Sequence, residues 1–375
     1  MHEHRAVAVV TGTEDGREAL RALARGGSHP GLITGRSTTN NNLVMIFSGQ
    51  GSQHLNMGHQ LYTTYPAYTR AFDDACAALD PHLPHPLHDI VFGTNPELLN
   101  QTQYTQPALF ALQTALYRLW EHWDITPTTL IGHSIGEITA AHAAGILNLT
   151  DAATLIAHRA RLMQNLPPGG AMVAINTTEN TIRPHLQGHE DKAAIAAINS
   201  PHSLVLAGDH HTLTHITQQL KNHHTTWLHV SHAFHSPLMD PALDQLRTLT
   251  QHLTTNPPTI PLVSTTTAQP IDHTNPEHWI NHARHTVRFA DALTHTNPHT
   301  DTYLEIGPHA SLLPHLPSTA LTSLHKNQPE PHTLTTTLAH LTTHGTNPNW
   351  HHYFQHTHAH HTPLPTYPFQ TTHYW

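Results

Sequence analysis

A serine between two glycines, where an apolar run gives way to a helical pattern, constrains the fold more than any other feature of the sequence. The stretch is LIGHSIGEITAAHAAG, residues 130–145. G-x-S-x-G is typical of a nucleophile elbow, in which the serine occupies a sharp strand-to-helix turn. Gly132 and Gly136 suit this turn, because close packing of helix on strand leaves no room for side chains. The alternative is structural: Ser134 is the N-cap of a helix, and Glu137 completes a capping box.

Length and charge exclude several classes of protein. With 375 residues, the chain predicts one large domain, a smaller one and flanking segments. A formal charge of -9 and a pI near 6.5 leave no basic field that would attract nucleic acid or an anionic membrane. No apolar run approaches the roughly 18 residues of a membrane span, and the first residues lack the layout of a signal peptide. We therefore expect a cytoplasmic protein.

Histidine is unusually abundant, with 43 residues against 16 Lys plus Arg. It is spread through every segment together with threonine and proline, which indicates a compositional bias of the whole chain and predicts no metal site. The run HHYFQHTHAHH (351–361) keeps a His-rich metal-binding protein open as an alternative. A histidine therefore carries information here only within a motif. The single cysteine, Cys76, lies in an amphipathic helical pattern and is expected to be a packing residue.

Strand and helix patterns alternate along most of the chain, which predicts an α/β layered fold. The apolar runs NLVMIFS and TTLIG each lead into a glycine turn, and helical periodicity covers 58–79 and 106–123. From residue 240 a helix and the strand PLVST continue this unit. TYLEIGPHASLL (302–313) then predicts a strand, a glycine turn and a helix. We assign 43–170 and 236–325 to a large subdomain.

Between these two parts the pattern changes to four short strand candidates. They are AMVAIN, AAIAAINS, SLVLAGD and TTWLHVS, and a helix is expected at about 211–222. Four strands with two helices on one face fit a ferredoxin-like unit, so we predict an inserted small subdomain at 171–235.

The two ends of the chain are expected to be linkers. Residues 1–42 predict one strand at Ala6–Thr11 and one helix at Arg17–Ala24, followed by a loop. Residues 326–375 are rich in proline, threonine and histidine, so this segment should lie over the surface of something else.

Seven motifs, taken together and in order, resemble the acyltransferase domains of modular type I polyketide synthases, which are relatives of malonyl-CoA:acyl carrier protein transacylases. The resemblance implies an α/β-hydrolase-like large subdomain with an inserted ferredoxin-like small subdomain and an active site between them. Residues 1–42 resemble the later part of the ketosynthase–acyltransferase linker, and LPTYPFQTTHYW the linker that runs back over the upstream domains. The motifs are GQGSQ (49–53), YTQPALFALQ (104–113), GHSIGE (132–137), HRARLMQ (158–164), INSP (198–201), HAFHS (232–236) and EIGPH (305–309).

The resemblance also implies the catalytic residues. Ser134 would be the nucleophile and His235 its base, although His235 could also be one of the many histidines. In this family a main-chain carbonyl holds the other ring nitrogen of the base, and the matching position is Asn281. The oxyanion donors would be the backbone N–H of Ile135 and Gln50. The GQGSQ motif could otherwise be a plain turn after a strand.

Substrate-binding residues follow from the same resemblance. Arg159 occupies the position that binds the free carboxylate of the acyl group, because a guanidinium can donate two parallel hydrogen bonds to it. A surface salt bridge is the alternative. Malonyl-type domains carry HAFH where methylmalonyl-type domains carry YASH, and this chain has HAFH with Phe234 filling the space of an α-methyl group. Ile135 is also of malonyl type, and three further residues are expected at the substrate site: His232, Gln106 and Asn199.

Malonyl-CoA would thus be the donor, and the phosphopantetheine thiol of an acyl carrier protein the acceptor, with an adjacent ketosynthase domain as a further partner through the linkers. The resemblance implies no intrinsic cofactor or metal, and no nucleic-acid or membrane partner. A thioesterase or lipase-like hydrolase is an alternative, but it would need an acidic third residue. A docking module without chemistry is another, but it would have lost Ser134, His235 or Arg159.

Overall fold

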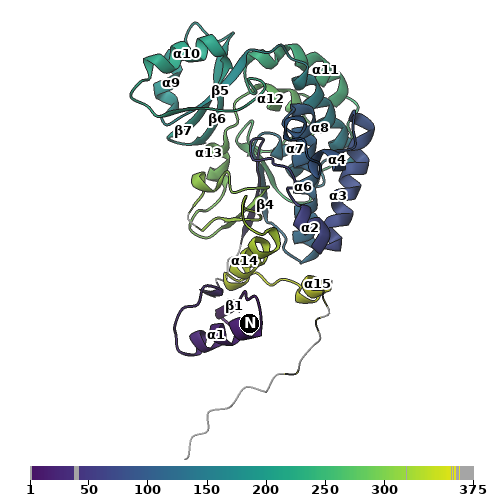
Figure 1. The fold of residues 1–375 in the computed structure, drawn as a ribbon. Helices are drawn as coiled ribbons and strands as arrows, with labels where there is room; N and C mark the ends of the chain where they lie inside the picture. The colour runs from purple at the N-terminus through teal and green to yellow at the C-terminus, as the bar shows by residue number, and fades with distance from the viewer. Residues whose placement is uncertain are drawn as a thin grey trace, which may run out of the picture.

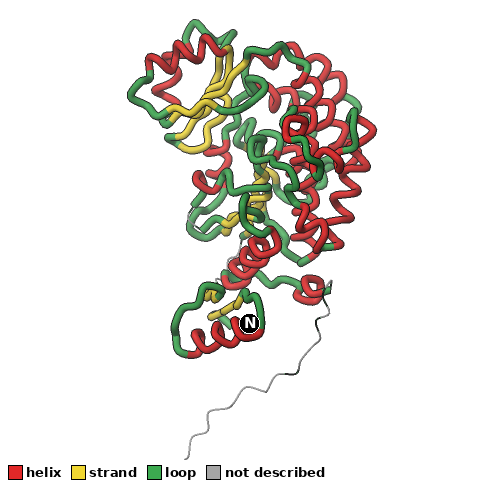
Figure 2. The backbone as a smooth tube through the Cα atoms, viewed as in Figure 1, coloured by secondary structure: helices red, strands yellow, loops and turns green. Residues whose placement is uncertain are grey.

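The computed structural model describes residues 2–37, 42–317 and 319–355, together with residues 357, 359 and 363. A large α/β subdomain carries a small sheet-and-helix subdomain at one end and a third, smaller layer at the other (Figure 1). Figure 2 shows the strands of the small subdomain as a group separate from those at the centre of the large one. This arrangement confirms the predicted α/β fold with a large and a small subdomain.

The large subdomain is built on a sheet with the strand order β10-β9-β4-β3-β11-β12. All its described pairings are parallel except that of β10 with β9. The central strand has the sequence LVMIF with all five residues buried, as expected for a parallel strand covered on both faces. The strands are β3 (Leu43–Phe47), β4 (Thr129–Gly132), β9 (Leu262–Ser264), β10 (Gln269–Pro270), β11 (Thr302–Ile306) and β12 (Leu321–Thr322).

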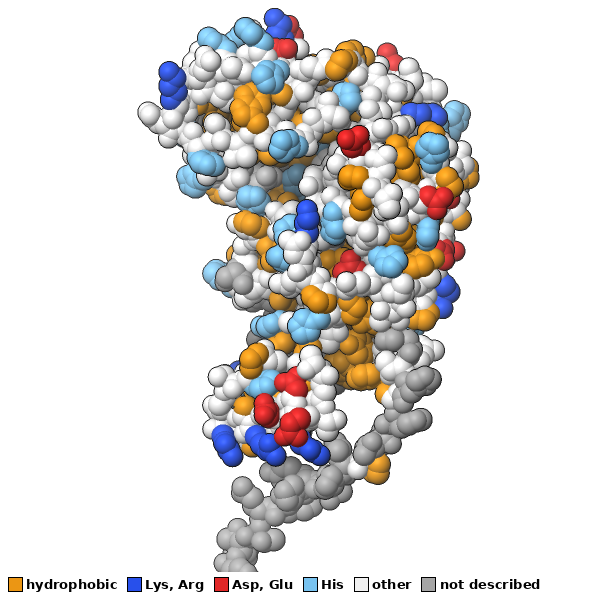
Figure 3. All heavy atoms as spheres, in the orientation of Figure 1, with side chains coloured by type: hydrophobic (Ala, Val, Ile, Leu, Met, Phe, Trp, Pro, Cys, Tyr) orange, Lys and Arg blue, Asp and Glu red, His pale blue; other side chains and the backbone are white. Residues whose placement is uncertain are grey.

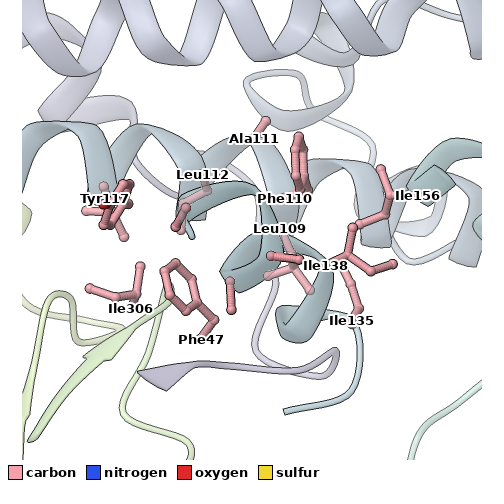
Figure 4. Packing of buried hydrophobic residues seen from close by; sticks show 14 of the residues in the cluster. Phe47, Leu109, Phe110, Ala111, Leu112, Tyr117, Ile135, Ile138, Ile156 and Ile306 are labelled. Atoms are coloured by element: carbon pink, nitrogen blue, oxygen red, sulfur yellow. The ribbon is translucent and has the colours of Figure 1, made fainter. Parts of the chain in front are cut away.

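Helices cover this sheet, and the long helix α6 (Thr102–His122) lies almost entirely in the core. Figure 4 shows Leu109 and Phe110 of α6 packed over Phe47 of β3 and Ile138 of α7. The other helices are α2 (His59–Thr64), α3 (Pro66–Leu79), α4 (Leu87–Val91), α5 (Pro96–Leu99), α7 (Gly136–Ala143), α8 (Leu149–Gln164), α11 (Asp240–Thr250), α12 (His278–Arg284) and α13 (Phe289–Ala292), with short 3₁₀ turns at Asp80–His82, Pro237–Met239, Leu293–His295 and Leu313–His315.

The small subdomain has an antiparallel sheet of order β6-β7-β5-β8 with two helices on one face. Alternating residues serve its two faces: Val173 and Ile175 pack with the helices, while Met172 faces the large subdomain's core. Order and pairing are ferredoxin-like, as predicted. The elements are β5 (Gly170–Ile175), α9 (Glu179–Leu186), β6 (Ala193–Ser200), β7 (Ser203–Asp209), α10 (His210–Gln219) and β8 (Thr225–Trp227).

The N-terminal segment and a C-terminal helix form the third layer. Strand β1 (His4–Ala8) pairs antiparallel with β2 (Leu32–Arg36), and α1 (Thr13–Ala24) connects them. Helix α14 (Glu330–Thr343) packs on this pair so closely that a Cβ on Gly35 would lie 2.9 Å from the carbonyl oxygen of Thr343. Helix α15 (Trp350–Phe354) follows.

Several sequence predictions for the ends of the chain are wrong. Residues 32–36 were expected in a loop but form β2, and the first helix begins at Thr13, four residues earlier than expected. The C-terminal segment contains α14, which the composition did not indicate. The helix expected after the EIGPH turn is only a 3₁₀ turn. The run LPTYPFQTTHYW lies outside the described residues, and the histidine run 351–361 lies there in part.

Within the described part of the chain, no helix combines the length and the apolar character needed to cross a membrane.

Candidate active site

Ser134 occupies the turn between β4 and α7, and its φ of 50° lies in the left-handed region. A non-glycine residue keeps such a conformation only when its surroundings enforce it. The flanking residues are glycines because neighbouring atoms leave no room for a side chain. A Cβ on Gly132 would lie 2.1 Å from Cα of Glu137, and one on Gly136 would lie 2.3 Å from the carbonyl oxygen of Phe47. The local structure is therefore the strand–turn–helix of a nucleophile elbow.

His235 faces Ser134 from the segment that follows the small subdomain. Its Nε2 lies 2.7 Å from Ser134 Oγ, and its Nδ1 lies 2.9 Å from the backbone oxygen of His285. Because a carbonyl oxygen can only accept, the ring proton is on Nδ1, and Nε2 is free to accept the hydroxyl proton. This is the tautomer that a general base requires.

The prediction that the backbone of Asn281 holds His235 Nδ1 is wrong. Asn281 lies one turn earlier on α12, and its own carbonyl accepts the His285 N–H at 2.8 Å. The helix ends at Arg284, and the chain becomes extended at His285, which directs the His285 carbonyl toward the base. The type of partner expected, a main-chain carbonyl in this segment, is the one observed.

Electrostatics keep His235 neutral. Burial, followed by the charges of Arg159, His282 and His133, holds its pKa well below the ordinary value of 6.5, although the His285 carbonyl acts in the opposite direction. A neutral ring at physiological pH can accept the serine proton without first losing one of its own.

His282 is a site residue that the sequence analysis missed. It is buried, and its Nε2 lies 2.8 Å from the backbone oxygen of Ser134, to which it donates. Burial lowers the pKa of His282 to about 4, against the raising effect of the Glu137 charge. The one available signal was its spacing of four residues from His278 on α12, which a chain with so many histidines obscures.

Glu137 does not form a capping box with Ser134. One carboxylate oxygen lies 3.0 Å from His278 Nε2, and the other accepts from Thr265 N at 2.8 Å and from Thr265 Oγ1 at 2.6 Å. Burial alone would raise the pKa of Glu137, but these hydrogen bonds and the charges of His282 and His278 lower it to about 2. Glu137 therefore ties α7 to α12 and to Thr265, the residue that follows β9, and the N-cap interpretation of Ser134 is wrong.

The loop after β3 lies against the elbow. A Cβ on Gly49 would lie 2.9 Å from His133 Nδ1, so the two turns touch. Gln50 lines the same cavity as Ser134. Ile135 directly follows the serine at the N-terminus of α7, where free backbone N–H groups and the helix dipole favour negative charge. Both residues predicted as oxyanion donors are thus close to the nucleophile.

Arg159 lies on α8 and is only 2 % exposed, so the alternative of a surface salt bridge is wrong. Its Nη1 donates to Gln106 Oε1 at 2.6 Å, and its Nε has no hydrogen-bond partner among the described residues. Burial lowers its pKa to about 10. No described carboxylate forms a salt bridge with Arg159, so this buried charge has no counter-charge.

Gln106 connects Arg159 to the reacting groups. Its Nε2 donates to Gln50 Oε1 at 3.4 Å, while its own Oε1 accepts from the guanidinium. Neither Gln106 nor Arg159 is on the cavity wall itself; Gln106 contacts Gln50, which is, and Arg159 contacts Gln106. The charge of Arg159 nevertheless acts on His235.

The remaining predicted residues occupy different places. Phe234 lines the cavity and is 7 % exposed. His232 is buried behind it, with Nε2 3.1 Å from the Leu166 carbonyl oxygen. Asn199, on β6, lines the cavity, and its Oδ1 accepts from His133 Nε2 at 2.9 Å. This hydrogen bond joins the small subdomain to the residue before the nucleophile.

The cavity between the subdomains has a volume of about 490 Å³. Ser134 and His235 lie in its wall, and none of the Asp or Glu residues that the structure describes does. On the face drawn in Figure 3, histidines gather around the junction of the two subdomains, where Lys and Arg are sparse. Apolar side chains supply much of the lining: Met172, Ala196, Ala197, Val205, Leu228, Val230, Val287 and Leu312.

Comparison with known families decides the assignment. The family described as "Acyl transferase domain" matches residues 44–355. The chain belongs to this family. It is an acyltransferase domain of the kind found in modular type I polyketide synthases, as the sequence motifs predicted, and its reaction is acyl transfer.

Individual relatives agree with this assignment. The chain is 40% identical to mycoketide-CoA synthase of Mycobacterium tuberculosis over 389 residues, which cover 100% of this chain and 9% of that protein. It is 37% identical to polyketide synthase GfsB of Streptomyces halstedii, over 100% of this chain and 7% of that protein. The acyltransferase domain thus spans less than a tenth of the length of these two relatives.

Solved structures match as well. The acyltransferase domain from the second module of the salinomycin polyketide synthase superposes with a TM-score of 0.92 at 39% identity, covering 98% of this chain and 89% of that one. FabD from Acinetobacter baumannii superposes with a TM-score of 0.70 at 27% identity, covering 80% and 99%.

The histidine content does not build a metal site in the described residues, where no group of three or more His, Cys, Asp or Glu is placed to hold a metal ion.

Proposed function

We propose that this acyltransferase domain moves a malonyl unit from malonyl-CoA, through an ester on Ser134, to the phosphopantetheine thiol of an acyl carrier protein in polyketide biosynthesis. The observation that carries the proposal is Arg159: a buried guanidinium that, among the described residues, has only the neutral Gln106 amide as partner, near a Ser–His pair. A dicarboxylic acyl group supplies the missing counter-charge. Acetyl and other neutral acyl groups do not.

The carboxylate would replace Gln106 as the acceptor of the guanidinium hydrogen bonds. Gln106 Oε1 now accepts from Nη1, and Nε is unpaired among the described residues, so a carboxylate gains a charge-assisted contact and satisfies a buried donor. Because Gln106 also contacts Gln50, the same movement would adjust the oxyanion side of the cavity. We assign Arg159 and Gln106 to substrate binding on this basis.

The chemistry then proceeds in two balanced halves. His235 Nε2 takes the Ser134 proton as Oγ attacks the thioester carbonyl, and the oxyanion is held at the N-terminus of α7 by the Ile135 N–H, with Gln50 beside it. Collapse breaks the C–S bond, and the CoA sulfur leaves with the proton from His235. In the second half, His235 takes the proton of the carrier thiol, which attacks the ester and returns Ser134 to its hydroxyl form.

A main-chain carbonyl in place of a carboxylate behind His235 favours transfer over hydrolysis. The His285 oxygen fixes the tautomer but supplies no full negative charge to stabilise the imidazolium. A thiol loses its proton more readily than water and is the better nucleophile, so it needs a weaker base. The two halves of the reaction require a CoA thioester and a carrier protein as partners. An adjacent ketosynthase domain, attached through the linkers, is the further partner in this proposal.

Mass spectrometry of the intact protein tests the proposal. Mixing with malonyl-CoA should add one malonyl group, located on Ser134, and Ser134→Ala should abolish the addition. Parallel incubation with methylmalonyl-CoA measures the preference. Labelling that persists in the alanine variant, or that maps to another residue, would contradict the assignment.

A further inference from the structure

The cavity that holds Ser134 is also lined by an exposed cationic side chain. Lys326, in the loop between β12 and α14, is exposed and is the one Lys or Arg among the described residues that line the cavity. No described carboxylate pairs with it. Its ammonium is therefore available to an anion that enters the cavity.

Two histidines hold this lysine in place. The Lys326 N–H donates to His309 Nδ1 at 3.2 Å, and His325 Nδ1 donates to the Lys326 carbonyl oxygen at 2.8 Å. The two rings pack edge to face with centroids 4.6 Å apart. Because His309 Nδ1 accepts a hydrogen bond, the proton of the neutral ring is on Nε2. His309 also lines the cavity, so its wall contains both an imidazole and an ammonium group.

We propose that Lys326 and His309 bind the phosphate of the pantetheine arm that the CoA donor and the carrier-protein acceptor have in common. The inference rests on the proposed function, because that function gives both substrates this arm. The thiol end must reach Ser134, the apolar walls formed by Met172, Val205 and Val230 suit the body of the arm, and the phosphate then faces outward.

Charge supports this assignment. The chain has a formal charge of -9, which repels anionic substrates, while the cavity wall, as far as the structure describes it, holds a lysine and no Asp or Glu. An ammonium–phosphate contact with an additional N–H donor is a charge-assisted hydrogen bond and is stronger than a neutral one. One subsite of this kind would serve both halves of the reaction, since each substrate brings its phosphate at the same distance from its sulfur.

The test compares two malonyl donors that differ in the phosphate. Malonyl-CoA carries it, and the N-acetylcysteamine thioester of malonate ends before it. Lys326→Ala should raise KM for malonyl-CoA about three- to tenfold, as expected for one partly exposed charged contact, and leave kcat/KM for the short thioester unchanged. Lys326→Arg should restore most of the affinity. Lys221→Ala, an exposed lysine of the small subdomain, is the matched control and should change neither value.

The acceptor half is tested separately, with malonyl N-acetylcysteamine thioester as donor and either 4′-phosphopantetheine or pantetheine as the free thiol. Wild type should prefer the phosphorylated acceptor, and Lys326→Ala should remove the preference. An effect with the donor alone would restrict the subsite to CoA and overturn its shared role. Equal losses with both donors, or no change with malonyl-CoA, would overturn the subsite altogether. If wild type transfers malonate from neither donor, the proposed function is what fails.

Discussion

The backbone oxygen of Ser134 lies 2.8 Å from Nε2 of His282, while the side chain of the same serine lies 2.7 Å from His235. One histidine thus holds the main chain of Ser134, and another contacts its hydroxyl, which under the proposed function it would activate. The first contact explains how a serine with a φ of 50° keeps its place. Since α12 carries His282 and ends beside the His285 carbonyl, a single short helix positions both the nucleophile and its base.

His282→Ala should therefore slow acylation without changing which acyl group is chosen. Loss of one buried hydrogen bond of about 1–2 kcal/mol predicts a fall in kcat of about tenfold, with the ratio of malonyl to acetyl turnover unchanged. His282→Gln offers an amide N–H in place of the imidazole and should recover part of the rate. Stopped-flow measurement of the first turnover at several malonyl-CoA concentrations gives the rate of acylation separately from substrate affinity. A changed acyl preference would mean that His282 acts on the substrate pocket instead.

Arg159→Ala should separate dicarboxylic from neutral acyl groups. It removes the guanidinium but leaves the nucleophile and base in place, so malonyl transfer should fall by about 100-fold or more while acetyl transfer is spared. Arg159→Lys keeps the charge without the two parallel donors, so its rate of malonyl transfer should lie between those of wild type and Arg159→Ala. Arg161→Ala, on the exposed face of the same helix, is the control. Equal losses for both substrates would make Arg159 structural.

The same variant should also shift the pH dependence of the reaction. The Arg159 charge is the second-largest cause, after burial, of the lowered pKa of His235. Without that charge the pKa of His235 rises. The ring then stays protonated, and cannot act as a base, up to a higher pH than in wild type. The acid limb of the rate of acetyl transfer, followed from pH 4 to 8, should therefore move upward. An unmoved limb would mean that the ring does not sense the guanidinium.

The parts of the fold that the sequence predicted are those determined locally. Continuous apolar runs become buried parallel strands, and Gly132 is required by its contact with Glu137, five residues further along the chain. Helix α14 was missed because its threonines and histidines have weak helical propensity. Contacts distant in sequence stabilise this helix. Glu330 accepts from the backbone N–H of Gly58, Gln60 and Leu61, and α14 packs on β1 and β2.

The site residues also differ in whether the sequence could predict them. Ser134 and His235 lie within motifs that are recognised by their side chains, so the sequence could indicate them. The carbonyl of His285 has no side-chain signature, because its role depends on where a helix stops. His282 acts on a main-chain atom 148 residues away in sequence, which no local pattern reveals.

Glu137 should make stability depend on pH in the acid range. Its pKa is about 2 in the folded protein against 4.5 ordinarily, so its stabilising effect is complete above pH 4.5 and is lost as the pH falls toward 2. Glu137→Gln removes this effect, which is worth on the order of 3 kcal/mol. Urea unfolding from pH 3 to 7 should show the variant less stable at neutral pH, with the gap narrowing in acid. Glu97→Gln, an exposed residue, should show no such trend.

Phe234 is expected to set the preference between malonyl and methylmalonyl groups. Phe234 forms part of the cavity wall, so its ring is in a position to occupy the space of an α-methyl group. We expect wild type to favour malonyl-CoA in direct competition. Phe234→Ser with His232→Tyr produces the YASH pattern and opens that space, while Ile135 and the rest of the wall remain.

The double variant should therefore show relaxed choice and reduced turnover, with a shift of about 1–3 kcal/mol in the ratio of specificity constants, the packing of one methyl group. Part of the lost turnover should come from His232, because the hydrogen bond of its Nε2 to the Leu166 carbonyl disappears with the ring. Phe234→Ser alone separates the two effects, since it opens the wall and keeps that bond. Competition kinetics with both CoA esters on the three proteins provide the measurement. A wild type that already favours methylmalonyl-CoA would contradict malonyl specificity, and a ratio that stays fixed in both variants would show that Phe234 does not select the substrate.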